Sequence, residues 1–530
     1  MRKNLLTLSI AAMVGGLSGV AAHAGPVVFD STATTNIAGN ATTPAIVGQL
    51  PPGTSAASGM AFNADGIGHV LLVPYFTTNG DNKSLLNIVN TDLTNGKAVK
   101  LRYRNALNSD DIFDITVYLS PGDVWTADVA ADAQGYSRLV TEDASCTAPS
   151  AAYIKEADNG RFATGRVLNN APAGTREGYI EILNTADIRP FLNGVDGSPD
   201  FSKPNPLFAT IKHVNDKAPC SAALLENSAV LVADANSPNS PRNRGYSYPT
   251  GGLFADWTIV NVTDKASFSG NAAAVQANGA GKLVWFPQSS TSVTALEAQG
   301  VTADPLLTQG RVQAALYDFP DLSTPYTTGA TTPEQQSTEL STRMAVRSVS
   351  NEYLSSAGIA FATDWVFSMP TRRYQVAVDY ATKTAVQVAN PILANEGTKH
   401  FVIKNNPKVG DFLGGNVTFD VANQRLCVTG FDTKSFNREE SSKTNAVISP
   451  AGVFNLCGEA NVLTFNNPTF SLMGAPAAIS QNVNTGFGDG WFTVSTPGYN
   501  NNGLPVLGFA ASKTRGANLG GTWAHRVTRR

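Results

Sequence analysis

The stretch that decides the fold class reads SLLNIVNTDLTNGKAVKLRYRNALNSDDIFDITVYLSPGDVWTADV and spans residues 84–129. Within it, apolar residues alternate with charged or polar ones over 99–104 and again over 113–119. Such a period of two is typical of strands that turn one face towards a core. The Ser-Pro-Gly-Asp at 120–123 has turn composition and is followed by another strand-like run, 124–129. The stretch therefore predicts consecutive strands of an antiparallel β-sandwich.

One register of the first two strands satisfies the core and the charges together. It aligns four pairs: Val99 with Val117, Leu101 with Ile115, Tyr103 with Phe113, and Arg102 with Asp114. The apolar pairs then face the core, and the Arg102–Asp114 pair lies on the outer face. A slip of one residue would expose the whole apolar set, so we expect this register to be fixed.

Further runs of strand character recur along the chain, including HVLLVPYFT (69–77), GYIEILN (178–184), TDWVFSM (363–369) and LPVLGFAAS (504–512). One helix is predicted among them, near 333–348, because Thr332 is a suitable N-cap and Pro333 suits the first helical position. The predicted fold class is all-β, with two or three immunoglobulin-like or related antiparallel β-sandwich domains and one short helix.

Composition shifts suggest where the domains begin and end. The segment 236–251, NSPNSPRNRGYSYPTG, is rich in proline, asparagine and serine and is the best internal boundary. The predicted organisation is a signal peptide at 1–24, a leader or linker at 25–60, an N-terminal sandwich at 61–240, a second β-rich domain with the helix at 241–399, and a C-terminal β-rich domain with a glycine-rich tail at 400–530.

The first residues have the features of a secretory signal peptide. Arg2 and Lys3 precede a short apolar run, and Ala22-His23-Ala24 forms a small-residue cleavage site before Gly25. Removal of 1–24 leaves 36 basic against 41 acidic residues, a net charge of −5. A weakly acidic chain without a basic block argues against a nucleic-acid partner. We find no later run of about 20 apolar residues, so no transmembrane segment is expected after cleavage.

Four cysteines follow the predicted signal peptide: Cys146, Cys220, Cys427 and Cys457. An even number in an exported chain favours disulfides, with three possible connectivities. We prefer the pairs nearest in sequence, Cys146–Cys220 and Cys427–Cys457. Their loops of 74 and 30 residues would contribute at most about 4.4 and 3.6 kcal/mol in the chain-entropy model. No CxxC spacing exists, which argues against zinc.

Four segments carry a resemblance to a group of uncharacterised exported or cell-surface proteins of Gram-negative bacteria. They are PTGGLFADWTIVNVT (249–263), YDFPDLSTPY (317–326), SNEYL (350–354) and TDWVFSMPTRRY (363–374). The resemblance spans most of the chain that follows the signal peptide, but its motifs consist mainly of apolar and turn residues. It implies location and a shared β-rich fold, and it assigns no catalytic residue.

No catalytic motif emerges from the sequence. The histidines after the signal peptide, His69, His213, His400 and His525, stand singly and without metal-ligand spacing. The carboxylate pairs Asp110-Asp111 and Glu439-Glu440 are expected in solvated loops, and Arg176-Glu177 is expected to form a local ion pair. We therefore assign no catalytic, cofactor-binding or metal-binding residue.

Two binding hypotheses remain open. The loops at 79–84, 193–200 and 486–491 have the oxygen-rich composition that calcium prefers, although Asx-rich turns look the same without metal. Five tryptophans, Trp125, Trp257, Trp285, Trp365 and Trp491, lie in strand-like runs and are expected in the core. Trp523 sits in the glycine-rich tail, where it is either docked onto a domain or exposed for a partner.

We expect an exported, non-catalytic structural or interaction protein of the cell surface or extracellular space, with the periplasm as an alternative location. It would bind proteins, or copies of itself, through β edges. The alternative is a module that binds surface glycans or small ligands through exposed aromatic residues, and a hydrolase is the third hypothesis. Three exposed aromatic residues on one face would favour the binding module, and a cleft with two carboxylates within about 10 Å would favour a glycosidase.

Overall fold

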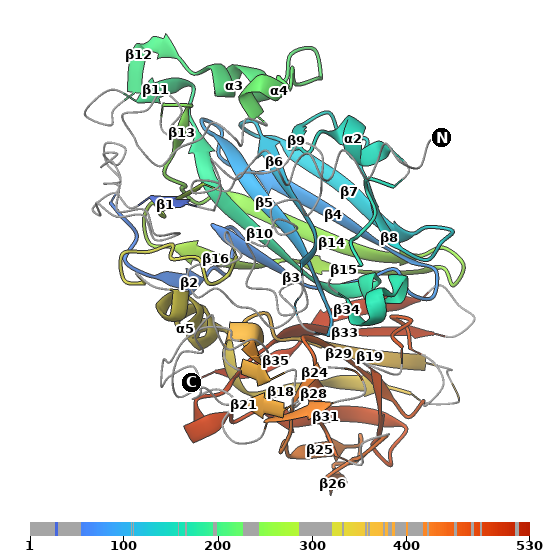
Figure 1. The fold of residues 1–530 in the computed structure, drawn as a ribbon. Coiled ribbons are helices and arrows are strands. Elements are labelled where there is room, and N and C mark those ends of the chain that lie inside the picture. The colour runs from blue at the N-terminus through green and yellow to red at the C-terminus, as the bar shows by residue number, and fades with distance from the viewer. Residues whose placement is uncertain are drawn as a thin grey trace.

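The computed structural model describes residues 27–29, 55–193, 199–225, 243–285, 321–330, 333–374 and 417–529, with short gaps inside these ranges, and the strand segments 377–379, 384–386 and 399–400. Nearly all regular structure in these ranges is antiparallel β, which confirms the all-β prediction. Four large sheets form two sandwiches, one above the other (Figure 1). We number these sheets I to IV.

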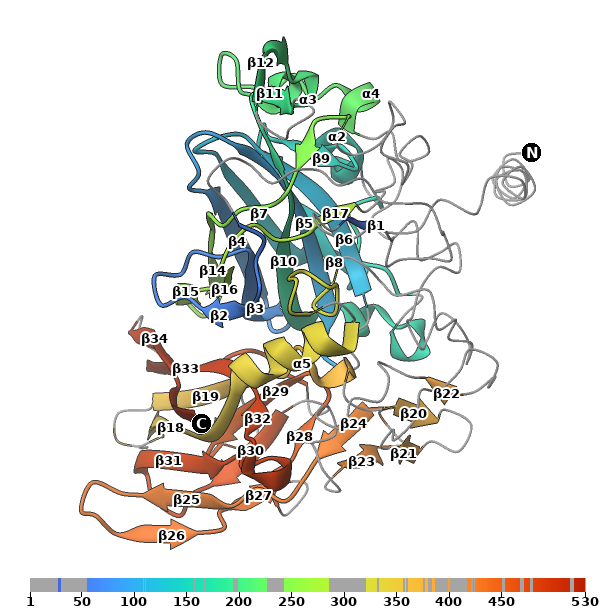
Figure 2. The ribbon, with the colours of Figure 1, turned by 90° about the vertical axis from the view of Figure 1, so that its left-hand side faces the viewer.

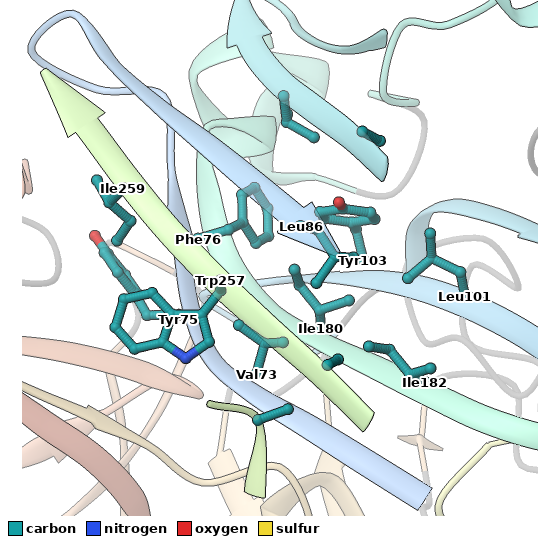
Figure 3. Packing of buried hydrophobic residues seen from close by; sticks show 14 of the residues in the cluster. Val73, Tyr75, Phe76, Leu86, Leu101, Tyr103, Ile180, Ile182, Trp257 and Ile259 are labelled. Atoms are coloured by element: carbon teal, nitrogen blue, oxygen red, sulfur yellow. The ribbon is translucent and has the colours of Figure 1, made fainter. Parts of the chain in front are cut away.

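Sheets I and II form the N-terminal sandwich. Sheet I has the order β2 (Met60–Phe62), β16 (Ala273–Ala277), β3 (Val70–Thr77), β10 (Glu177–Ile188), β5 (Gly96–Asn105), β6 (Asp111–Leu119) and β9 (Cys146–Ala148), with β13 (Tyr246–Ser247) paired to β10. Sheet II has the order β15 (Ala266–Asn271), β14 (Leu253–Asn261), β4 (Asn82–Asn90), β7 (Val124–Ala131) and β8 (Ser137–Val140). Their facing side chains form one buried apolar cluster, which Figure 3 shows from close by.

Strands β5 and β6 pair in the predicted register. Leu101 lies opposite Ile115 and Arg102 opposite Asp114, and the Val99–Val117 and Tyr103–Phe113 pairs are present as well. The apolar members are fully buried against sheet II. The hairpin prediction is therefore confirmed in pairing and register.

The predicted exposure of the outer face of this hairpin is wrong. Arg102 and Asp114 are buried, as are Lys100 and Arg104 on the same strand. The cover comes in part from residues far along the chain, because Asp321 lies 4.0 Å from the Arg104 guanidinium and Arg373 donates to the Ser109 carbonyl. Alternation of charged and apolar residues predicted the strands correctly but did not reveal that both faces of sheet I are buried.

Sheets III and IV form the C-terminal sandwich. Sheet III has the order β27 (Val447–Ser449), β30 (Ser480–Asn484), β29 (Ala460–Phe465), β19 (Phe361–Ser368), β33 (Leu507–Thr514) and β34 (Gly520–Ala524), with only β29 and β30 parallel. Sheet IV has the order β26 (Ser442–Thr444), β25 (Thr433–Phe436), β31 (Asp489–Ser495), β18 (Ala345–Leu354) and β32 (Leu504–Pro505), with β35 (Arg526–Arg529) paired to β18. Apolar side chains between these two sheets form a second buried cluster.

Sheet III contributes buried side chains to both apolar clusters. On β19, Trp365 and Phe367 belong to the core of the C-terminal sandwich, whereas Val366 between them belongs to the core of the N-terminal one. Because side chains alternate along a strand, the outer face of sheet III closes an open side of the N-terminal sandwich. Phe509 on β33 packs there against Trp257 of β14, with 4.6 Å between ring centroids. The two sandwiches therefore share a buried apolar interface.

The strand pairing does not follow the expected domain boundaries. Strands β14 to β16, after the boundary at 240, belong to sheets I and II. Strands β18 and β19, before the boundary at 399, belong to sheets III and IV. The described sheets thus form two sandwiches, and the chain passes from one to the other between β17 (Leu283–Trp285) and β18.

The predicted helix is present as α5 (Pro333–Met344), with Pro333 at its first position, and it ends directly before β18. It lies across the junction of the two sandwiches (Figure 2), where Glu339 accepts a hydrogen bond from the Met60 amide at 2.6 Å. Three further short helices were not expected: α2 (Ala151–Lys155), α3 (Pro206–Ile211) and α4 (Ala222–Leu225).

Smaller sheets complete the described structure. They are β1 (Val27–Phe29) with β17, β11 (Phe191–Asn193) with β12 (Pro199–Pro204), β20 (Ala377–Asp379) with β21 (Thr384–Val386) and β22 (Lys399–His400), and β23 (Val417–Asp420) with β24 (Arg425–Val428) and β28 (Leu456–Cys457).

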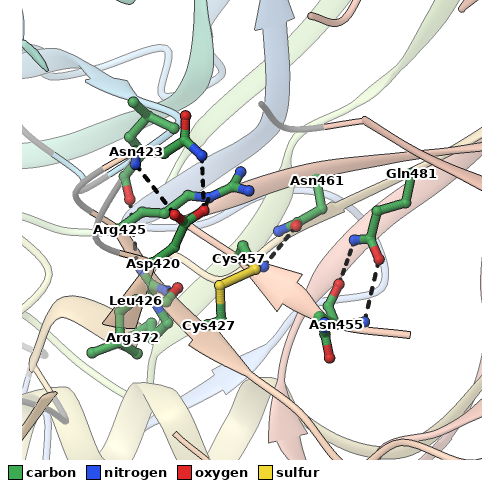
Figure 4. The surroundings of a disulfide bond; sticks show 11 residues. Arg372, Asp420, Asn423, Arg425, Leu426, Cys427, Asn455, Cys457, Asn461 and Gln481 are labelled. Carbon is green, nitrogen blue, oxygen red and sulfur yellow. Dashed lines mark hydrogen bonds and ion pairs between the residues drawn. A yellow bond between two sulfur atoms is a disulfide. The ribbon is translucent and has the colours of Figure 1, made fainter. Parts of the chain in front are cut away.

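Both predicted disulfides are present, one in each half of the molecule. Cys146 on β9 joins Cys220, which follows α3, and Cys427 on β24 joins Cys457 on the neighbouring β28. Figure 4 shows the second bond beside Asn461, whose side-chain oxygen accepts from the Cys457 amide at 2.8 Å. Such bonds fit an oxidising compartment. In the described part of the chain, no helix has the length and apolar character needed to cross a membrane.

Candidate functional site

The last described segment of the chain completes both sheets of the C-terminal sandwich at the same side. Strand β34 is the outermost strand of sheet III and pairs with β33, and β35 follows after one residue, His525, and pairs with β18 in sheet IV. Among the described strands, neither β34 nor β35 pairs with any other. We call this surface, formed by β34, β35 and the preceding Leu519, the tail side.

His525 fixes the crossing between the two sheets. Its ring stacks on Phe367 with 5.0 Å between centroids. Nε2 donates to the Val366 carbonyl at 3.0 Å, and Nδ1 lies 3.3 Å from the Asn351 amide nitrogen. This geometry fits a neutral ring, and burial lowers the pKa of His525 to about 4. The tail side is therefore held to the core by a ring that stays uncharged at neutral pH.

Three large apolar side chains are exposed on the tail side. Leu519 is 68% exposed, Trp523 47% and Val527 39%. Trp523 pairs with Ala510 and Val527 with Val349, and both partners are buried in the sandwich core. Because cross-strand partners point to the same face, Trp523 and Val527 occupy core-facing positions that no further strand covers within the described structure.

Trp523 combines features of the two alternatives predicted for it, because its segment is docked onto sheet III as β34 while its side chain is about half exposed. Of the five tryptophans expected in the core, Trp125, Trp257 and Trp365 are buried there. The prediction for Trp491 is wrong, because Trp491 is 41% exposed on the outer face of sheet IV. The side chain of Trp285 lies outside the described residues.

The outer face of sheet IV carries an aromatic pair. Trp491 stacks on its cross-strand neighbour Phe436 with 4.0 Å between centroids and 7° between the ring planes. The Lys434 ammonium lies 4.7 Å from the Phe436 ring. The two rings thus contact each other, and the rest of the aligned row consists of Ser442 and Glu352. Because the two rings stack on each other, they leave less ring surface free for a sugar than three aromatic residues side by side would.

A cluster of charged side chains is buried on the outer face of sheet I. Lys100 pairs with Asp114, and Arg102 pairs with Asp111 at 2.6 Å. Arg104 lies 3.3 Å from the carboxylate of Glu181 on β10. Asp111 was expected in a solvated loop, but it is the first residue of β6 and is buried; its neighbour Asp110 lies outside the described residues. We call these residues the charged layer.

The charged layer continues into the C-terminal half. Tyr374 donates to Asp321 at 2.9 Å, and Asp321 in turn lies near Arg104. Arg372 pairs with Glu459 at 3.0 Å and also donates to the Leu426 carbonyl. Arg373 reaches the Ser109 carbonyl in the N-terminal half at 2.8 Å. Cations and carboxylates alternate across the junction, so the layer joins the two sandwiches electrostatically.

Burial shifts the proton affinities in the charged layer. It raises the pKa of Asp114 and Glu181, an effect that the neighbouring cations oppose, and it lowers the pKa of Lys100 to about 8. Perturbed groups of this kind also occur at catalytic sites. Here the hollow next to Asp321 has room for about one water molecule. Among the described residues, the layer therefore joins the two sandwiches, and the hollow beside Asp321 is too small for a substrate.

Two further buried carboxyls lie at the junction, and sequence reasoning missed both. Glu177 on β10 accepts from the Tyr75 hydroxyl at 2.7 Å, and burial raises its pKa to about 8. Asp364 on β19 accepts from the Ser471 hydroxyl at 2.7 Å and from the Met473 amide at 3.1 Å, and burial raises its pKa to about 7.

The ion pair expected between Arg176 and Glu177 does not form. Arg176 instead donates to the Gly135 carbonyl at 2.8 Å, and Glu177 is buried. Arg176 has helical backbone angles at the end of the 3-10 turn Pro172–Thr175, and Glu177 is the first residue of β10, so the chain changes conformation between them. The sequence held no signal for the burial of Glu177 beside Tyr75 of β3.

The remaining candidates from the sequence do not converge. His69 is buried at the start of β3, where Nδ1 accepts from the Ala277 amide, and His213 lies 3.6 Å from Asp123. The His400 side chain lies outside the described residues. Glu439 and Glu440 are in an exposed turn, as predicted. No group of three or more His, Cys, Asp or Glu side chains suited to a metal occurs in the ranges that the structure describes, which exclude much of the 193–200 loop.

Comparisons with known proteins add no relative. No family model matches the chain, and searches of curated proteins and of solved structures find no significant match.

Proposed function

We propose that this chain is an exported, non-catalytic interaction protein of the cell surface or extracellular space, and that the tail side of its C-terminal sandwich binds another polypeptide chain. The observation that carries the proposal is the exposure of Trp523 and Val527 at core-facing positions of two outermost strands. A partner strand or apolar surface placed there would bury these side chains and pair with the free backbone edges.

The two sandwiches together support this assignment. The N-terminal sandwich buries one of its open sides against sheet III, an apolar surface of the same chain. At the tail side of the C-terminal sandwich β15 reaches only Thr522 by a hydrogen bond, and Leu519, Trp523 and Val527 stay exposed. A second copy of the chain or another exported protein would supply the missing cover.

Export is supported by the predicted signal peptide, the resemblance to exported and cell-surface proteins, and the two disulfides. Fractionation of native cells, combined with N-terminal sequencing of the purified protein, tests this part. We expect the protein outside the cytoplasm with Gly25 as its first residue. A cytoplasmic protein that retains Met1 would contradict export.

Site-directed photo-crosslinking tests the binding surface. A benzoylphenylalanine at position 523 should give discrete polypeptide adducts in native cells, because the side chain would contact the partner. The matched control is the same substitution at Leu93, which is 82% exposed on the N-terminal sandwich and should give none. Mass spectrometry distinguishes a second copy from a different protein. Absence of polypeptide adducts from positions 519, 523 and 527 would refute the proposed binding surface.

A further inference from the structure

A cleft of about 500 Å³ lies where the two sandwiches meet at their edges. One wall is the β14–β15 hairpin, from Val260 to Phe268, and the other is formed by Lys513 and Gly520 of the β33–β34 region. Strand β15 lies next to β34 at this junction (Figure 1), and the Ser269 amide donates to the Thr522 hydroxyl at 3.1 Å. Clefts between domains are common places for small ligands.

Lys513 brings a largely buried cation into this cleft. The residue is only 8% exposed, and its ammonium donates to the main-chain carbonyl of Asp264. Within the described structure no carboxylate lies within 4.0 Å of the ammonium, and the Asp264 carbonyl accepts its hydrogen bond. An ammonium has three donors, and a buried cation without a counter-charge is costly. An anion in the cleft would supply the counter-charge and further hydrogen-bond acceptors for the Lys513 ammonium.

A second lysine stands on the opposite wall. Lys265 lines the cleft, is exposed, and is likewise without a carboxylate within 4.0 Å in the described ranges. Its backbone adopts a φ of 51°, a left-handed conformation that is unfavourable for a non-glycine residue. The two lysines therefore provide positive charge from both sandwiches.

The turn that carries Lys265 is held in place by the N-terminal sandwich. Asn261 accepts from the Asp264 amide at 2.8 Å, while its own amide nitrogen donates to the Gly80 carbonyl at 2.6 Å. The same turn points the Asp264 carbonyl at Lys513. Because these bonds fix the turn, a ligand would not have to order it on binding, and such preorganisation favours affinity.

The remaining lining is mainly apolar. Val260, Ala266 and Phe268 line the hairpin wall, and Val262, 72% exposed, also belongs to the lining. The Ser267 hydroxyl and the Asn261 amide are the polar side chains of this wall apart from the lysine. A ligand that fits has an acidic group for the lysines and an apolar body for the valines.

From this lining we infer that the cleft is a binding site for a small organic anion with an apolar body, such as an amphiphilic carboxylate or sulfonate. Lys513 and Lys265 contact the acidic group, and Val260 and Val262 contact the apolar part. The cleft includes Gly520 at the start of β34 but neither Trp523 nor Val527, and the inference does not depend on the proposed protein partner.

The test uses the full mature protein and the fluorescent anion 1-anilinonaphthalene-8-sulfonate, with neutral N-phenyl-1-naphthylamine as its matched probe. We expect saturable binding of one sulfonate molecule, and binding of the neutral probe at least about tenfold weaker, since a charged hydrogen bond typically contributes this much. Lys513→Met should weaken sulfonate binding about tenfold or more for the same reason. Lys434→Met, on the outer face of sheet IV, is the charge-matched control and should change nothing.

Two more variants keep the test decisive if Lys513→Met impairs folding. Lys265→Met removes an exposed cation, and Ser267→Trp fills the cleft from an exposed position; both should reduce sulfonate binding while the circular dichroism spectrum stays unchanged. Trp523→Ala should leave binding intact, which excludes the tail side as the probe site. Equal affinity for the two probes, or sulfonate binding that survives both Lys265→Met and Ser267→Trp, would overturn the inference.

Discussion

The two sandwiches place similar strand patterns in opposite environments. On β5 of the N-terminal sandwich, Lys100, Arg102 and Arg104 alternate with core residues and are fully buried. On sheet IV, Lys434 and Thr493 occupy aligned positions of the same kind, but they remain partly exposed to solvent. Sheet I is covered on both faces, whereas sheet IV is covered on one face only.

The difference shows that an alternating pattern reports the period of a strand and not the environment of its polar face. What decides burial is whether another part of the chain lies over that face. Around Arg104 the cover includes Asp321, with Tyr374 bonded to it, and both are more than two hundred residues further along the sequence. Carboxylates paired with these cations, on sheet I itself and at Asp321 on the cover, make their burial tolerable.

The largest expected effect comes from breaking the charged layer. Arg104→Met should destabilise the protein by about 3–5 kcal/mol, because it leaves Glu181 and Asp321 without their buried cation. Guanidinium unfolding followed by tryptophan fluorescence measures this cost. The matched variant Lys434→Met, on the solvated face, should cost less than about 1 kcal/mol. Similar costs for the two variants would remove the distinction between the faces.

A pH-dependent effect of intermediate size is expected from Asp364 at the junction. Burial raises the pKa of Asp364 to about 7 in the folded protein, above its ordinary value of 3.8, so the folded state holds the proton more tightly than the unfolded state. The stability that this group contributes is present below about pH 4 and is lost as the pH rises to about 7. Asp364→Asn removes this dependence.

The measurement is the unfolding free energy of Asp364→Asn and of the unmodified protein at pH 5 and pH 8. Relative to the unmodified protein, the variant should gain up to roughly 3 kcal/mol over this interval, at 1.36 kcal/mol per pKa unit. Glu177→Gln, on the N-terminal side of the same junction, should behave in the same way but with a transition extending to about pH 8. A difference that does not change with pH would show that Asp364 is ionised in the folded protein.

The smallest effect is expected at the tail side. Trp523→Ala should cost only about 1–2 kcal/mol, because roughly half of the indole already contacts water. Thermal unfolding measures this cost. Trp491→Ala, at similar exposure on the outer face, is the control and should have a comparable cost. A loss of several kcal/mol at Trp523 alone would show that the tail side is part of the folded core and does not serve as a free surface.

Much of the local structure could be predicted from the sequence. The register of β5 and β6 follows from the need to bury Leu101 and Ile115 together, and the start of α5 follows from Pro333. Both disulfides follow from choosing the nearest cysteine pairs. These features depend on residues that are close in sequence, and short-range patterns carry the needed information.

Features that depend on distant segments could not be predicted. The expected boundary at 240 followed a proline-rich composition, but β14 pairs with β4, which lies far upstream. Trp491 lies in a strand with buried neighbours, and only its place on the solvated face of sheet IV makes it exposed. The same holds for the cleft, since Lys265 and Lys513 are brought together by the packing of two sandwiches.

The crossing at His525 affects the order in which the molecule can be completed during synthesis. Strand β18 begins at Ala345, but its partner β35 ends at Arg529, so sheet IV lacks this outer strand until the chain has been made as far as Arg529. Sheet III likewise lacks its outermost strand until β34 has been made. Pairings between such distant segments form slowly. A growing chain would therefore leave sheets III and IV incomplete until β34 and β35 have been made.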